Sequence, residues 1–550
     1  MDKQEKIRLV IAIALTAALM FGWQYVFGPS QEQVEQARQA AEVEQRTAAV
    51  LDAPAPVPAT DESGFVASKG ESVTVDTPLY VATFNSQGGV LESFVLKRFK
   101  ETTEPDSLNV DLVGEKAAAR GALGLFLSRG GDDQVHTWKY GEWALQGGDI
   151  VINEQDETKS LTFMGEVHGY KITRVLTFNP TTYLIEETTT VLNGNDTGVE
   201  GSLSFHAAAK SMSGEDDMYN PTRVAYLNLE GRDEMEDVDD LQEVGLTASG
   251  GLEWGAIVSN YFMFAAAPGS PEAALSANYQ DDVYRMALAE DAAFIPNVAK
   301  TFSVSYFIGP TDRHMLETMP NQLAEAVNFG WFDFLAKPML IGLDFFYEYV
   351  HNYGVAIILL TIVIKLLFWP LSQKSYESME QMKKLQPMVQ KLREKYGDDK
   401  QRMNQETMAL YKTYKVNPMG GCLPMIVQIP VFFGLYKALM GAVELRHAPF
   451  IENLPFTDIP WLADLSAKDP YYITPLVMGA TMFLQQKMTP SAGDPMQQKI
   501  MLLMPVIFTF MFLQFPSGLV IYWLMNNVLS IGQQLLIVRA HKKKAEAAEA

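Results

Sequence analysis

Long apolar runs constrain this chain more than any other feature of its sequence. A helix needs about 20 mostly apolar residues to cross the hydrocarbon of a bilayer. Runs that approach or reach this length lie at 7–27, 355–371, 422–443, 471–483 with its flanks, 500–515 and 519–538. The sequence therefore predicts an α-helical membrane protein with six spans. Five spans are the alternative, because the fourth and fifth runs are short or broken by proline.

A single charge, Lys365, interrupts the run 355–371. An ammonium group at the bilayer centre costs about 2.5–3.5 kcal/mol on insertion scales, so such a residue usually faces protein, water or a substrate. The alternative is that Lys365, which lies shortly before Pro370, extends its amine to the membrane interface. Lys365 is therefore the first candidate for a functional site.

Charged residues separate along the chain. Region 28–344 holds 20 Lys/Arg and 49 Asp/Glu, whereas region 345–550 holds 20 and 15. Both ends of the chain are basic, and segment 372–418 has 10 Lys/Arg against 6 Asp/Glu. The positive-inside rule then predicts a multi-pass protein with both termini and segment 372–418 in the cytoplasm and the acidic region in the periplasm. This distribution does not favour a nucleic-acid substrate.

The first part of the chain reads as an anchor, a tether and a folded domain. Bulky aromatic residues end the run 1–27, where a signal peptidase needs small ones, so we expect an uncleaved N-terminal transmembrane anchor. Segment 28–64 is rich in Gln, Ala, Glu and Pro and predicts a flexible periplasmic linker. In 65–330, short Thr-, Val-, Tyr- and Phe-rich stretches alternate with Gly, Asn and Asp turns, which predicts a large antiparallel β-sandwich with connecting helices at its C-terminal end.

The outer domain shows no catalytic or metal-binding pattern. In its β-rich part, His136, His168 and His206 lack metal-ligand spacing and no nucleophile motif accompanies them, so satisfied structural histidines are expected. Cys422 is the only cysteine, which excludes an intramolecular disulfide. The domain is interpreted as a binding or scaffolding module, and no enzyme activity, metal or cofactor is expected.

Helical periodicity returns after the β-rich region. In segment 331–350, large apolar residues recur at helical spacing and charged residues occupy other positions, which predicts an interfacial amphipathic helix, with a core helix of the outer domain as the alternative. After a second span at 351–371, apolar residues in 372–418 repeat every three or four positions on both sides of Gly397, which predicts a cytoplasmic helical hairpin. The hairpin leaves four basic residues for water, lipid head groups or a partner: Lys383, Lys384, Lys391 and Arg393. The remaining segments are a third span at 419–443, a periplasmic loop at 444–470, spans four to six at 471–538 and a basic cytoplasmic tail at 539–550.

Four motifs in the second half of the chain are distinctive: NPMGGCLPMIVQIPVFFGLY, DPMQQKIM, MPVIFTFMF and FPSGLVIYWLMNN. They closely resemble the YidC/Oxa/Alb family of membrane protein insertases in its Gram-negative bacterial form, and the resemblance extends over nearly the whole chain. It implies that five of the six transmembrane helices form an insertase core. This core holds a hydrophilic groove, open to the cytoplasm and lipid of the inner membrane and closed toward the periplasm. Such a groove receives nascent membrane proteins, alone or with a Sec-type translocon, and helps them to insert and fold without a nucleotide or metal.

The resemblance also assigns groove positions. Lys365 stands where the family usually has arginine, so the charge is kept while the bidentate geometry of a guanidinium group is lost. Thr361, Gln428, Tyr522 and Trp523 are groove candidates by their positions in the matching motifs. The alternatives are that Thr361 bonds a preceding carbonyl, that Gln428 joins two helices, and that the aromatic residues pack or anchor at an interface.

Two other functional classes explain less of the sequence. A transporter or channel normally needs acidic or coordinating groups near the midplane, and these apolar runs contain none. A membrane-anchored periplasmic enzyme acting on sugars would explain a sandwich domain but leave the other helices without a role. A ribosome contact through the hairpin and the tail that begins at Arg539 is a further expectation, with membrane lipids as the alternative partner.

Overall fold

The structure is a computed structural model. The structure describes residues 70–549 apart from 105, 131–133, 213–219, 397–398, 415, 417–422 and 489–494. The predicted anchor 1–27, the predicted linker 28–64 and the first six residues of the motif that begins at 417 lie outside the described residues.

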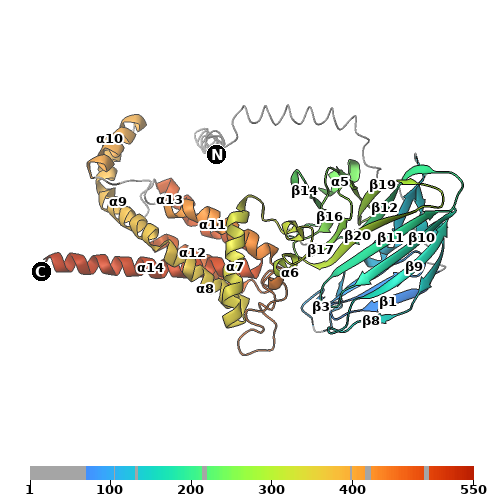
Figure 1. Ribbon diagram of the computed structural model, residues 1–550. Coiled ribbons are helices and arrows are strands. Elements are labelled where there is room, and N and C mark those ends of the chain that lie inside the picture. The colour runs from blue at the N-terminus through green and yellow to red at the C-terminus, as the bar shows by residue number, and fades with distance from the viewer. Residues whose placement is uncertain are drawn as a thin grey trace. The chain divides into compact units, whose positions relative to one another are not determined.

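Three β-sheets make up most of the chain before residue 311 (Figure 1). The five-stranded sheet contains, in spatial order, β4 (Asn109–Asp111), β3 (Val90–Lys100), β2 (Tyr80–Asn85), β1 (Ser72–Asp76) and β8 (Ile150–Val151). The nine-stranded sheet contains β14 (Gly231–Met235), β13 (Arg223–Asn228), β16 (Trp254–Val258), β17 (Phe262–Pro268), β20 (Ala299–Pro310), β11 (Leu184–Asn193), β10 (Tyr170–Phe178), β9 (Lys159–Val167) and β7 (Glu142–Gln146). The six-stranded sheet contains β15 (Leu246–Ala248), β18 (Ala274–Gln280), β19 (Val283–Phe294), β12 (Val199–Lys210), β5 (Leu125–Ser128) and β6 (Gln134–His136). Within the described strands, pairing is antiparallel except between β1 and β8.

Alternating burial explains why these segments form strands. In β10, every second residue from Tyr170 to Phe178 is buried, and β11 shows the same period. Successive side chains of a strand point to opposite faces, so this pattern gives the sheet one core face. The predicted domain rich in antiparallel strands is confirmed.

A buried ion pair lies between β10 and β11. Arg174 Nε and Nη2 donate to Glu187 Oε1 and Oε2, each at 2.8 Å, and both side chains are 0% exposed. Arg174 also donates to the carbonyl of Leu123 at 2.8 Å. The pair therefore joins two neighbouring strands to the turn that precedes β5, and removing one partner would leave the other charge buried.

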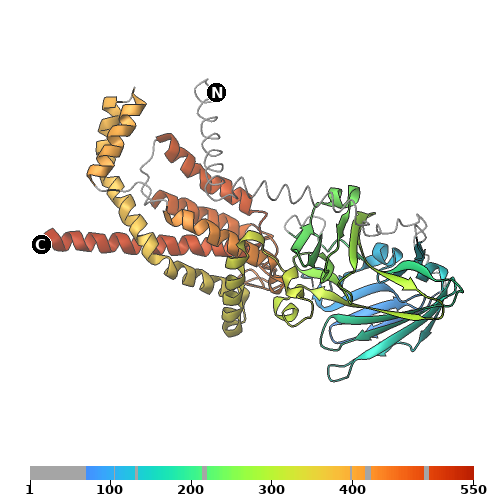
Figure 2. The same cartoon turned by 45° about the horizontal axis from the view of Figure 1, so that its top comes forward.

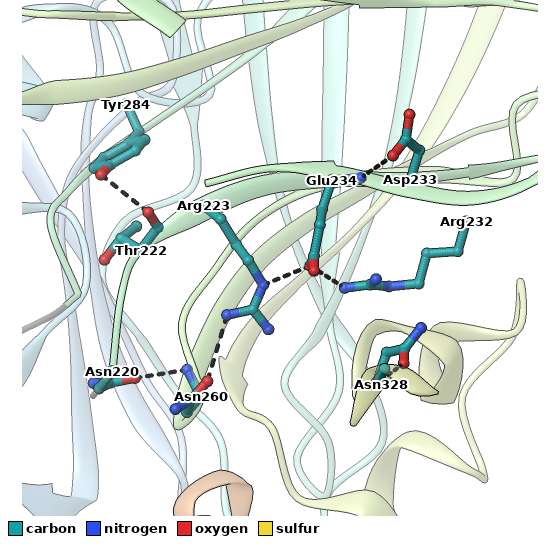
Figure 3. Close-up of polar contacts among 10 residues, drawn as sticks. Asn220, Thr222, Arg223, Arg232, Asp233, Glu234, Asn260, Tyr284 and Asn328 are labelled. Carbon is teal, nitrogen blue, oxygen red and sulfur yellow. Dashed lines mark hydrogen bonds and ion pairs between the residues drawn. The ribbon is translucent and has the colours of Figure 1, made fainter. Parts of the chain in front are cut away.

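A second ionic group lies at the β14 edge of the nine-stranded sheet (Figure 3). Glu234 Oε2 accepts hydrogen bonds from Arg223 Nε at 2.7 Å and from Arg232 Nη2 at 2.6 Å. Arg223 Nη1 also lies 3.4 Å from Asn260 Oδ1. Burial opposes ionisation of Glu234, but the two guanidinium groups outweigh it and hold the pKa of this carboxyl below its ordinary value. These charges are paired with one another at the sheet edge.

Short helices connect the strands and lead out of the sheets. They are α3 (Gly114–Ala119), α4 (Thr137–Tyr140), α5 (Val238–Glu243) and α6 (Arg313–Leu316), with the 3₁₀ helices η1 (Leu323–Ala326), η2 (Gly330–Phe332) and, later in the chain, η4 (Val443–Leu445). The longer helices follow: α7 (Asp333–Val350), α8 (Tyr353–Leu367), α9 (Trp369–Tyr396), α10 (Lys400–Thr413), α11 (Leu423–Gly441), α12 (Ile473–Met488), α13 (Pro495–Phe512) and α14 (Ser517–Glu549). Helix α8 packs against α7 and α14, while α12 packs against α13 and α14.

Helix α7 coincides with the predicted amphipathic segment. One face is buried through Ala336, Met339, Leu340 and Leu343 and packs against α8 and α11. The opposite face exposes large apolar side chains, namely Phe334 at 66%, Ile341, Phe345 and Tyr349, and Trp331 in the preceding η2 is 76% exposed. A helix with a second, exposed apolar face suits the boundary of a bilayer.

Helices α9 and α10 lie side by side as a hairpin (Figures 1 and 2). Met382, Leu385 and Val416 form a small buried cluster, and Met379 and Tyr411 pack against it. Met379 and Met382 of the predicted hairpin therefore serve as packing residues. Pro370 lies in the first turn of α9, which explains why α8 ends at Leu367, because proline cannot supply a backbone N–H to a continuing helix.

Among the described residues, length and composition single out one helix that could cross a membrane, Ser517–Arg539 within α14. Helices α8 and α9 meet the same criterion only together, and they are bent by 62° at their junction. Shorter apolar helices, Ile426–Gly441 and Met501–Phe512, lie within α11 and α13. The predicted count of six spans is thus not established by helix length, and the first of the six lies outside the described residues. Helix α14 continues through most of the predicted tail, to Glu549.

Candidate functional site

Lys365 lies in the last turn of α8 and is partly buried. The helix begins after Asn352, whose side chain accepts a hydrogen bond from the backbone N–H of Val355 at 3.0 Å. At the other end, Lys365 Nζ donates to Oδ1 of Asn526 on α14 at 2.8 Å. Within the described chain, the ammonium group is therefore paired with a neutral amide across two helices, rather than extended away from them.

Gln428 on α11 forms a hydrogen bond with the same oxygen atom of Asn526. Its Nε2 donates to Asn526 Oδ1 at 2.7 Å. The structure thus brings together two of the residues predicted from the sequence, Lys365 and Gln428, through a third residue that the sequence analysis did not single out. Side chains from α8, α11 and α14 meet at this point, and we refer to Lys365, Gln428 and Asn526 as the polar cluster.

Thr361 lies one turn before Lys365 and is 1% exposed. Its Oγ1 donates to the backbone carbonyl of Ile357 at 2.6 Å. This is the local bond that a threonine in a helix commonly makes. The hydroxyl is therefore engaged by its own helix.

The two aromatic candidates on α14 pack among other side chains. Tyr522 is 1% exposed. The Trp523 ring lies 4.8 Å from the Phe432 ring and 5.3 Å from the Phe512 ring, measured between centroids. Trp523 therefore packs against aromatic residues of α11 and α13, and Tyr522 belongs to the buried hydrophobic core.

Helix α14 carries a row of polar residues that the sequence analysis missed. Asn527, Ser530, Gln533 and Gln534 follow Asn526 on the same helix, and each is at most 4% exposed. Gln534 Nε2 donates to the carbonyl of Met488 at 2.8 Å. The signal was the spacing of Asn, Ser and Gln within an apolar run, since buried polar side chains in a membrane helix usually face other helices. These residues lie C-terminal to the polar cluster along α14, and Asn527 and Gln534 contact α12.

The basic residues predicted on the hairpin lie on α9. Lys383, Lys384 and Lys391 are exposed, whereas Arg393 is half-buried. Lys384 Nζ lies 4.0 Å from Glu380 Oε1, an exposed pair of small energetic weight. Three lysines are thus presented to the surroundings of the hairpin.

The histidines of the β domain have structural environments. His206 is fully buried, and its Nδ1 lies 3.1 Å from the carbonyl of Gly121. Burial and the nearby Arg285 lower the pKa of His206 to about 3, so the imidazole is neutral at physiological pH. His168 occupies the turn between β9 and β10 with φ +49°. In the described part of the chain, no group of three His, Cys, Asp or Glu side chains could hold a metal ion.

A carboxyl with an unusual pKa follows the end of α11. Glu444 lies in η4 and is partly buried. Burial raises its pKa to about 7, and the charges of Asp312 and Asp344 add to the increase. His314 Nε2 lies 3.2 Å from Asp344 Oδ2 in the same group. This cluster is separate from Lys365 and its partners.

Comparison with known proteins decides the family. Residues 345–545 match the family model described as 60Kd inner membrane protein, and residues 72–341 match the model described as YidC periplasmic domain. A protein of Maridesulfovibrio salexigens named membrane protein insertase YidC is 53% identical, over 97% of this chain and 98% of that protein. The chain belongs to the YidC family of membrane protein insertases. The resemblance carried by its motifs is thereby confirmed.

Other members of the YidC family are similarly close. The proteins of that name from Nitratidesulfovibrio vulgaris strain Miyazaki F and Lawsonia intracellularis are 50% and 47% identical, each over 97% of this chain and 99% of theirs. A solved structure of an active YidC insertase, with its first transmembrane domain resolved, is 16% identical and covers 91% of this chain and 98% of its own, with a TM-score of 0.37.

Proposed function

We propose that this protein inserts nascent membrane proteins into the bacterial inner membrane and helps them fold, alone or with a Sec-type translocon. Membership of the YidC family supports the insertase class. The observation that carries the mechanism is the polar cluster, in which the Lys365 ammonium is paired with the neutral amide of Asn526 between apolar helices.

The cluster addresses the main barrier to insertion. Polar flanks and unpaired backbone groups of a client are costly to move through hydrocarbon. A hydrophilic groove, with Lys365 as its cation and Thr361, Gln428, Tyr522 and Trp523 along its walls, would shorten that path. An acidic flank of the client is drawn to Lys365, and its apolar segment then leaves into lipid by hydrophobic partitioning. No bond is made or broken, so the protein acts as an insertase and chaperone rather than an enzyme.

The proposed topology follows from the charge distribution. Six spans place both termini and the α9–α10 hairpin in the cytoplasm and the β domain in the periplasm. The exposed apolar face of α7 lies in the interface of the periplasmic leaflet. Helices α11 and α13, each with an internal proline, cross the membrane as shorter apolar segments that neighbouring helices support.

The exposed lysines of α9 give the cytoplasmic side a basic surface. Lys383, Lys384 and Lys391 are available to the anionic ribosome that delivers a nascent client, and the same charges suit anionic lipid head groups. Arg393 belongs to this surface in part, since it is half-buried.

Reconstitution tests the proposed function directly. Proteoliposomes that contain only this protein receive a newly synthesised single-span client with an acidic N-terminal tail, and insertion is measured by protection of the translocated tail from added protease. We expect protection to exceed that in protein-free liposomes by at least about tenfold. Equal protection in both kinds of vesicle would contradict autonomous insertion, and recovery on adding a Sec-type translocon would restrict the proposal to joint action.

A further inference from the structure

Asn526 occupies the centre of the polar cluster. Its Oδ1 accepts from Lys365 Nζ at 2.8 Å and from Gln428 Nε2 at 2.7 Å. An ammonium group is only a donor, so the atom of Asn526 that faces Lys365 must be the carbonyl oxygen. The Asn526 NH₂ group therefore points away from the ammonium. One oxygen atom thus sets the position of both donors.

The partner of Lys365 carries no charge. Asn526 supplies a dipole but leaves the positive charge uncompensated, and in the described chain no carboxylate pairs with Lys365. A carboxylate binds an ammonium more strongly than an amide does, because it carries a full negative charge that attracts the cation, whereas the amide offers only a dipole. Lys365, Gln428 and Asn526 are all partly rather than fully buried, so the cluster remains partly accessible.

The remaining donors favour an anion. After its bond to Asn526, the Lys365 ammonium retains up to two further N–H groups, and the amides of Gln428 and Asn526 add more. The shared acceptor oxygen, in contrast, already serves two donors. A carboxylate, which only accepts, matches such a set.

We infer that Asn526 is a positioning residue that sets the charge selectivity of the site: its neutral oxygen holds Lys365 until a client carboxylate replaces it. The inference rests on the proposed function. A fixed carboxylate at position 526 would occupy the ammonium permanently, whereas a neutral acceptor yields to an incoming anion.

The test replaces the NH₂ group of the Asn526 side chain by an oxygen atom, which makes the side chain a carboxylate. Asn526→Asp keeps the size of the side chain and still accepts from Lys365 and Gln428, so the three helices remain joined. Insertion into proteoliposomes is measured for two clients that differ only in the tail, one with aspartates and one with asparagines at the same positions. We expect Asn526→Asp to lower insertion of the acidic client about tenfold relative to the neutral client. Asn526→Ser, which keeps a neutral acceptor, should preserve the wild-type ratio within about twofold.

The outcomes separate the inference from the function on which it rests. If the wild type inserts neither client, the proposed function fails. If the wild type inserts both and Asn526→Asp keeps the wild-type ratio between them, the inference is overturned while the function stands. Equal loss of both clients in Asn526→Asp, with the ratio unchanged, would also overturn it, because Asn526 would then serve the packing of α14 and not the charge of the site.

Discussion

Lys365 and Gln428 donate to the same oxygen atom, Oδ1 of Asn526, at 2.8 and 2.7 Å. The two residues lie on different helices, α8 and α11, and their common acceptor lies on α14. The cation is therefore fixed relative to three helices by a bond that an anion can displace.

Thr361→Val should leave insertion nearly unchanged. The hydroxyl donates to the carbonyl of Ile357 in its own helix, and valine has almost the same shape. We expect insertion of an acidic client within about twofold of wild type and a change in unfolding free energy below about 1 kcal/mol. A tenfold loss of insertion without loss of stability would mean that the hydroxyl reaches the client.

Arg174→Met should destabilise the β domain strongly. The substitution leaves the Glu187 carboxylate buried without its bidentate partner, which costs about 3–5 kcal/mol. Thermal unfolding of the full-length protein, followed by circular dichroism of the β signal, measures the loss. The double variant Arg174→Met/Glu187→Leu serves as the control and should recover part of the stability, because it leaves no charge in the core. No recovery would show that the ion pair contributes chiefly through contacts with Leu123 and other neighbours.

Glu444 should make the protein less stable as pH rises. Its ordinary pKa is 4.5, and in the folded protein burial, with the nearby aspartates, raises the pKa to about 7. A raised acid pKa means that the folded state binds the proton more tightly than the unfolded state. The contribution is therefore fully present below pH 4.5 and is lost as pH rises through about 7, up to about 3 kcal/mol.

Glu444→Gln isolates this effect, since glutamine does not ionise. The variant and wild type should unfold at similar temperatures at pH 4, and the variant should be the more stable of the two at pH 8. A constant difference between them at both pH values would contradict the raised pKa.

The sequence predicted those structural elements that short stretches of neighbouring residues determine. The cost of a charge in an apolar run singled out Lys365. The helical spacing of large apolar residues among charged ones located α7. Thr-, Val- and aromatic-rich stretches between turn residues identified the β domain. Which strands pair could not be predicted: β17 lies beside β20 although β18 and β19 intervene in the chain, and such a pairing depends on tertiary packing.

The candidate site was predicted only in part, because the sequence does not show which helices pack together. Gln428 was found through a motif, but Asn526 was missed, because an asparagine in an apolar helix indicates only that some other helix lies nearby. Its partners depend on how α8, α11 and α14 pack. Thr361 shows the opposite case, in which the structure supplies a local partner for a residue that the motif position had assigned to the groove.

The most direct test of the central claim is insertion of an acidic-tailed client by Lys365 variants in proteoliposomes, each with its folding checked. The account predicts that wild type and Lys365→Arg insert the client, whereas Lys365→Ala and Lys365→Glu lose at least about tenfold, with the glutamate variant the weaker because it repels the acidic tail. Equal insertion by all four proteins would contradict the account and show that the Lys365 charge does not recruit the client.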